Sequence, residues 1–140
     1  MSVSRSFDDD FVVHVPPPGE SVALRRFDDA LDFVFLLQPA DDAMVALCDE
    51  HRHVLLVVET AARHLGQVPA LAGRLDAVTS AIVFTCVPVD EAPPEDSLLA
   101  WHRLQVGFES EGLELLDWLQ VDDELVRSLA ETAGHTRPWP

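Results

Sequence analysis

The stretch Ala81-Ile-Val-Phe-Thr-Cys-Val87 is the most strand-like run of the sequence, because apolar residues fill most of it. A polar, proline-rich loop over residues 88–95 follows, and the apolar spacing after this loop predicts a helix over residues 96–111. Gly112 would end that helix, since glycine tolerates the left-handed backbone found there. Residues 113–121 then return as a strand. This strand–helix–strand order predicts a sheet with helices on its faces.

Two further strand-like runs precede this unit and are predicted to form a β-hairpin. Ala43-Met-Val-Ala-Leu-Cys48 and Val54-Leu-Leu-Val-Val58 are joined by the short polar link Asp49-Glu-His-Arg-His53. Both runs are almost continuously apolar, so we expect helices to cover both faces of these strands. Helical spacing of apolar residues predicts one helix over residues 27–37, and a second is expected over residues 68–79.

The predicted fold is an α/β three-layer sandwich in which helices flank a mixed β-sheet. A chain of 140 residues has room for one core of this kind. We expect residues 1–20 to be loosely ordered apart from a short strand at Phe11-Val-Val-His-Val15. A single α/β domain is expected over residues 21–134, followed by a C-terminal tail over residues 135–140. Within residues 122–133, apolar side chains at helical spacing favour a helix.

The chain is strongly acidic: 25 acidic residues face 9 basic ones, which gives a formal net charge of -16. Nucleic acids and anionic membranes attract Lys and Arg, so this balance argues against both as partners. It is compatible with a basic protein partner or with a solvated acidic surface. The sequence contains neither the roughly 18 apolar residues of a transmembrane helix nor an apolar signal core at its N-terminus. We therefore expect a cytoplasmic protein with reduced cysteines.

None of the common catalytic signatures is present, so candidate sites depend on small groups of residues. His51 and His53 could hold a metal if they shared one face of a strand, but they fall in the predicted hairpin link, which favours a solvated turn. Cys86 ends a strand, and His102 could lower the pKa of its thiol if the next helix folded back. A buried, unreactive thiol is the simpler interpretation of Cys86.

Acidic and aromatic residues supply the remaining candidates. The densest carboxylate cluster, which would either cap a helix or bind a hard cation, consists of Asp90, Glu91, Glu95 and Asp96. Capping is the simpler interpretation of this cluster. Trp101 and Trp118 are predicted to anchor the core or a groove. Trp139 would serve either as a docking residue or as a contact that fixes the tail to the body of the protein.

Three parts of the sequence together resemble a known family. Glu109-Ser-Glu-Gly-Leu-Glu-Leu-Leu-Asp-Trp-Leu-Gln-Val121 contains a helix end, a turn and a strand with the pattern G-x-x-L-L-D-W. Met44-Val-Ala-Leu-Cys-Asp-Glu-His-Arg-His-Val-Leu55 is a hairpin, and Ala81-Ile-Val-Phe84 is a strand before a loop. In this order they resemble the RadC-type JAB/MPN domain of the JAMM metalloprotease superfamily. The resemblance implies a JAB/MPN-like fold of cytidine-deaminase-like architecture, with a short strand within residues 122–133.

The positions that carry zinc in that family hold other residues in this chain. The family's strand runs into the motif H-N-H-P-S-G, and an Asp further along completes its zinc site. With the prolines aligned, Thr85 and Val87 stand at the two histidine positions. Ser97 stands near the aspartate position, with Asp96 beside it, and Trp118 replaces the histidine of the family's L-L-D-H strand. Valine cannot ligate a metal and threonine is a poor zinc ligand, so the resemblance implies the fold and argues against the activity.

Three functional hypotheses follow. The first is a catalytically inactive JAB/MPN-like domain, a pseudoenzyme without metal or cofactor, that binds a protein partner or forms a homodimer. Its contact residues would include Trp118, Trp139 and the carboxylates of residues 90–96. The second is a hydrolase with a rewired, zinc-free site around Cys86, His102 and the same carboxylates. The third is an unrelated small α/β domain.

Overall fold

The computed structural model describes residues 3–7, 11–15, 23–24, 26, 28–30, 32, 43–86, 95–121 and 126–132. Its described strands form one seven-stranded sheet with the order β1-β2-β4-β3-β5-β6-β7. Neighbouring strands are antiparallel except for β5 and β6, which are parallel, so the sheet is mixed. The strands are β1 Val3–Phe7, β2 Phe11–Val15, β3 Ala43–Cys48, β4 Val54–Thr60, β5 Ser80–Cys86, β6 Glu114–Val121 and β7 Val126–Ser128.

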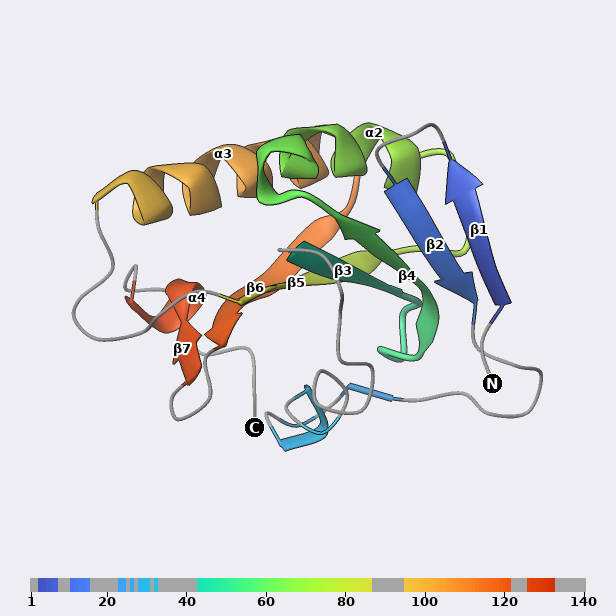
Figure 1. The fold of residues 1–140 in the computed structure, drawn as a ribbon, viewed down its shortest axis with the longest axis horizontal. Helices are drawn as coiled ribbons and strands as arrows, with labels where there is room; N and C mark the ends of the chain where they lie inside the picture. Colours follow the sequence, from blue (N-terminus) through green and yellow to red (C-terminus); the bar gives the residue numbers. More distant parts are fainter. Residues whose placement is uncertain are drawn as a thin grey trace.

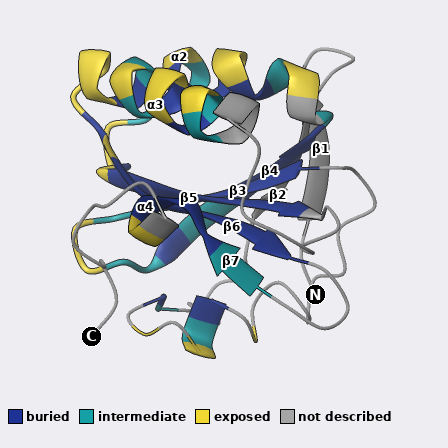
Figure 2. Cartoon of the chain, turned by 90° about the vertical axis from the view of Figure 1, so that its left-hand side faces the viewer, coloured by how far each residue is buried: buried dark blue, intermediate teal, exposed yellow. Residues whose placement is uncertain are grey.

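The helices α2 and α3 cover one face of this sheet. The 3-10 helix η1 (Ala62–Gln67) leads directly into the short α2 (Val68–Ala72), and α3 (Glu95–Ser110) crosses over between β5 and β6. Figure 1 shows α2 and α3 together above the sheet, with α4 (Leu129–Thr132) beside the end of β6. The exposed residues of α3 face away from the sheet (Figure 2), as expected of a helix that buries only one side.

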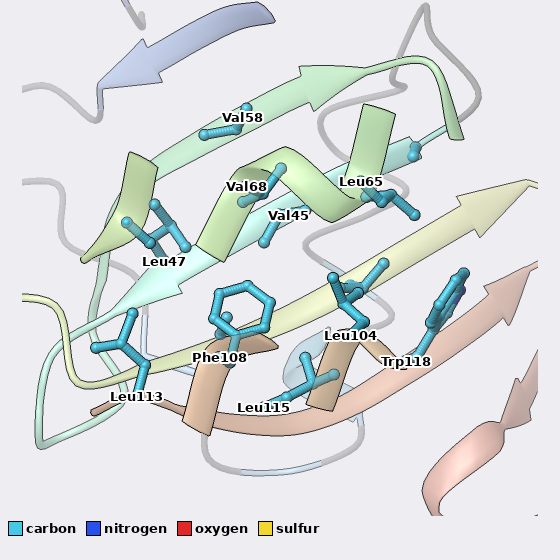
Figure 3. Packing of buried hydrophobic residues seen from close by; sticks show 14 of the residues in the cluster. Val45, Leu47, Val58, Leu65, Val68, Leu104, Phe108, Leu113, Leu115 and Trp118 are labelled. Carbon is cyan, nitrogen blue, oxygen red and sulfur yellow. The ribbon is translucent and has the colours of Figure 1, made fainter. Parts of the chain in front are cut away.

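Hydrophobic side chains pack on both faces of the sheet. The larger cluster lies between the sheet and the helices, where Phe108 and Leu104 of α3 lie over Val45 and other strand residues (Figure 3). Trp101 of α3 and Val83 of β5 belong to the same cluster. The second cluster lies on the opposite face, where Leu24 and Ala30 pack against strand residues such as Met44 and Phe84. Because both faces of β3 and β5 are buried, nearly every residue of these two strands is apolar. The chain has an α/β fold, as predicted.

The strand–helix–strand unit forms as the sequence predicts. Gly112 has a φ of 76° and follows the last turn of α3. Its backbone N–H donates to Glu109 O at 3.0 Å, and the N–H of Leu113 donates to Phe108 O at 2.9 Å. These two bonds make a Schellman motif, which satisfies carbonyls at the helix end and turns the chain into β6. A side chain at Gly112 would have to adopt a strained backbone conformation.

The N-terminal segment differs from the prediction. Residues 1–20 were expected to be loosely ordered with one strand, but the structure places two strands there, β1 and β2, which pair antiparallel with each other. β2 in turn pairs with β4, from Phe11 opposite Thr60 to His14 opposite Val57. β1 is short and contains two serines, so its own hydrophobic pattern does not predict a strand. Its backbone hydrogen bonds come from the pairing with β2, which in turn pairs with β4.

Two predicted helices also need correction. The helix expected over residues 68–79 ends at Ala72. After Gly73 the backbone N–H groups donate only three residues back, as in a turn, and the chain then meets the sheet, where Thr79 N–H donates to Cys48 O at 2.9 Å. For residues 122–133 the apolar spacing favoured a helix and the family resemblance implied a short strand. The described residues 126–132 contain both, because β7 pairs with β6 and α4 follows at once. Of the helix expected over residues 27–37, the described residues 28–30 and 32 are helical.

Candidate functional site

Thr85 and Trp118 meet on the helix-covered side of the sheet. Trp118 pairs in register with Val83, and Thr85 lies two residues further along β5 on the same face of the sheet. Both residues are buried, with 3% and 8% of their surface exposed. The indole Nε1–H of Trp118 donates to Thr85 Oγ1 over 2.8 Å. This hydrogen bond joins β5 to β6 inside the sheet.

Asp117, the neighbour of Trp118, is fully buried and joins β6 to the last two elements. Its Oδ1 accepts the backbone N–H of Trp118 at 2.7 Å and that of Ala130 at 3.2 Å. Its Oδ2 accepts Ser128 Oγ–H at 2.7 Å. Ser128 Oγ also accepts the backbone N–H of Glu131 at 3.2 Å, as an N-cap residue does. This carboxyl group holds β7 and the start of α4 against β6.

Sequence reasoning missed the role of Asp117. The signal that could have found it is the pattern Ser128-Leu-Ala-Glu131, a serine followed three residues later by a glutamate, which marks a helix start. That pattern predicts the helix start alone, because the approach of the Asp117 carboxyl group to its first turn depends on the pairing of β6 with β7.

The His-x-His pair lies in the β3–β4 turn, as predicted. Asp49 Oδ1 accepts the backbone N–H groups of His51 at 2.9 Å and His53 at 3.0 Å, and Arg52 takes a φ of 62°. The ring centroids of the two histidines lie 6.5 Å apart, nearly edge-on. Partial burial tends to raise the pKa of Asp49, but the two backbone N–H groups and the nearby imidazoles outweigh it and lower that pKa below its ordinary value.

A pocket of about 430 Å³ opens beside Trp118. Trp118, Leu65 and Leu104 line it with apolar surface from three different elements, and they lie at the same end of the packed cluster in Figure 3. Arg63 and Arg103 line it with positive charge, and both side chains belong to exposed residues. Trp118 was predicted to anchor either the core or a groove, and it takes part in both.

The remaining predicted site residues are not brought together by the described parts of the chain. His102 is exposed on α3, which lends no support to a site shared with Cys86. Cys86 is the last residue of β5, and its side chain lies outside the described residues. The first turn of α3 holds residues whose side chains are likewise not described: Glu95, Asp96 and Ser97. The others lie wholly outside the described residues: Val87, Asp90, Glu91 and Trp139.

Cys48 is a buried free thiol at the end of β3. Burial above all, together with the charge of Asp49, raises the pKa of Cys48 to about 12, against a smaller opposing effect of Arg52. A thiol with this pKa is protonated near neutral pH and is a poor nucleophile.

Neither a protein-family model nor a curated protein matches the sequence. Among the described residues, no three His, Cys, Asp or Glu side chains gather in a way that could hold a metal ion. In the same part of the chain, every helix is too short or too polar to cross a membrane.

Proposed function

We propose that this chain is a catalytically inactive domain of JAB/MPN-like fold that acts by binding another protein. The observation that carries the proposal is the hydrogen bond between Trp118 and Thr85. In this bond Thr85 Oγ1, the only side-chain atom of Thr85 that could ligate a metal, accepts from an indole N–H, which cannot itself ligate one.

The order of elements supports the fold part of the proposal. The hairpin β3–β4, the helix α2, the strand β5, the helix α3 and the parallel strand β6 follow one another as the resemblance to the JAB/MPN domain implies. The short strand β7 lies within residues 122–133, where the resemblance also implies a strand.

The chemistry of the site supports the absence of metal-dependent activity. Zinc in proteins is bound by Cys, His, Asp or Glu, and a catalytic site needs three such ligands. The hydroxyl of Thr85 already accepts a hydrogen bond, and the indole N–H of Trp118 can only donate one. These residues do not fit a zinc ion, so no reaction step is assigned to them.

The surface beside Trp118 supports a binding role. Leu99 and Val106 are exposed on α3, with 46% and 50% of their surface accessible, and Leu99 belongs to the pocket lining. Large apolar side chains exposed next to a pocket are typical of surfaces that contact a partner.

A hydrolase screen tests the proposal. The purified protein is offered peptide, ester and amide substrates with and without added Zn²⁺, and we expect no turnover above the buffer rate. Thr85→Ala and His102→Ala serve as matched variants. Turnover that Zn²⁺ stimulates, or that either substitution abolishes, would contradict the proposal.

A further inference from the structure

The pocket beside Trp118 continues into an exposed stripe along α3. Leu99, Arg103 and Val106 are spaced by four and three residues, so they lie on one face of the helix. In order, the stripe presents an apolar, a cationic and an apolar side chain. Leu99 and Arg103 also line the pocket, which makes stripe and pocket one continuous surface. A small molecule would fill the pocket alone, whereas a stripe two helical turns long fits a longer ligand.

The charge of this surface opposes that of the whole molecule. The chain has only 9 basic residues and a net charge of -16, yet two arginines, Arg63 and Arg103, line this one pocket. Neither guanidinium forms an ion pair or hydrogen bond within the described part of the chain. Unpaired guanidinium groups beside apolar surface are well suited to a carboxylate.

We propose that the pocket and stripe bind a peptide segment of a partner protein in which a single Asp or Glu is flanked by large apolar side chains. The apolar side chains would lie on Leu65, Leu104 and Trp118 in the pocket and on Leu99 and Val106 of the stripe. The carboxylate would pair with Arg103 or Arg63. A segment with many acidic residues is disfavoured, because the net charge of the protein would repel it.

This inference rests on the proposed binding function and specifies its partner. The two can fail separately: the hydrolase screen does not depend on the pocket, and the variants below do not touch the Thr85–Trp118 bond.

The structure offers a variant that blocks the pocket without disturbing the fold. Gly66 lines the pocket, and a Cβ built on it would have no atom within 4 Å. Gly66→Phe therefore places a ring in or over the pocket without a backbone clash. Ala70→Phe, at an exposed position of α2 that is not part of the pocket lining, is the matched control.

The experiment is a selection of random linear peptides, displayed on phage, against the immobilised full-length protein. We expect the selected peptides to carry one acidic residue between large apolar residues. Their affinity should fall about tenfold for Arg63→Glu/Arg103→Glu, since each exposed ion pair contributes only a few-fold, and the loss should shrink at high salt. Arg74→Glu, an exposed arginine away from the pocket, should bind as the wild type does.

Gly66→Phe should lose binding while Ala70→Phe retains it, with unchanged thermal unfolding in both. The inference is overturned if the selection yields no binder, if the selected peptides are rich in Lys and Arg, or if they bind the Gly66→Phe variant as tightly as the wild type.

Discussion

The β3–β4 turn and the interior of β6 both contain aspartates that accept backbone N–H groups, but they differ in what surrounds them. At the turn, Asp49 accepts from His51 and His53 beside solvent. Within β6, Asp117 is fully buried and accepts from Trp118, Ser128 and Ala130, the last two belonging to elements late in the chain. The first aspartate shapes a local turn, whereas the second joins three elements.

This difference shows where the sequence is misleading about chemistry. The His-x-His of the turn is the most ligand-like pattern in the chain, yet its neighbouring aspartate is occupied by the turn's own backbone. Two polar groups inside the sheet, those of Asp117 and Thr85, are likewise used in bonds that hold the fold together. The two arginines of the pocket, Arg63 and Arg103, differ from these groups, because neither has a side-chain partner within the described residues.

The largest effect is expected for Asp117→Ala. Removing the carboxyl group takes a buried acceptor from Ser128 Oγ and from the Ala130 N–H, so the free energy of unfolding should fall by about 3 kcal/mol. Urea denaturation measures the free energy of unfolding of this variant and of Asp49→Ala. The Asp49→Ala substitution should lower that free energy by about 1 kcal/mol or less. Equal losses in the two variants would remove the distinction between the two aspartates.

A smaller effect is expected at the Thr85–Trp118 bond. Thr85→Val keeps the shape of the side chain but leaves the buried indole N–H without this acceptor, which should cost about 1 to 3 kcal/mol. In the Trp118→Phe background, Thr85→Val should cost much less, because no donor is left unpaired. A double-mutant cycle by urea denaturation measures this coupling, and additive losses would show that the bond contributes nothing.

The smallest effect concerns pH and the turn. The pKa of Asp49 is lower in the folded protein than its ordinary value of 3.8. The stability that its charge confers is therefore fully present above that value and is lost as the pH falls through the lower, folded pKa. The wild type should exceed Asp49→Asn in free energy of unfolding by about 1 kcal/mol or less at neutral pH, with the gap closing well below pH 3.8. A gap that widens in acid would reverse the assigned sign.

The central part of the fold is predictable because long apolar runs define it. The hairpin β3–β4 and the unit β5–α3–β6 each follow from runs of apolar residues bounded by polar or glycine-containing links. β1 was missed because a strand of alternating serines has no strong pattern until β2 pairs with it. The helix after Val68 was overestimated because apolar spacing continues past Gly73, where the backbone turns.

The sequence indicates individual residues of the candidate site but not the contacts between them. Thr85 and Trp118 were each singled out from the sequence, but their mutual hydrogen bond depends on the register of β5 against β6. The pocket joins residues of η1, α3 and β6, which no local pattern links. Contacts between elements far apart in the chain are set by packing, and a single sequence carries no direct signal for them.

We propose that the Thr85–Trp118 contact leaves no room for a zinc ion at Thr85. The most direct test is the zinc content of the full-length protein, measured by elemental analysis after incubation with excess Zn²⁺ and removal of unbound metal. We expect far less than one zinc ion per chain, with the same value for Thr85→Val. One tightly held zinc ion per chain, lost in the Thr85→Val variant, would contradict the account.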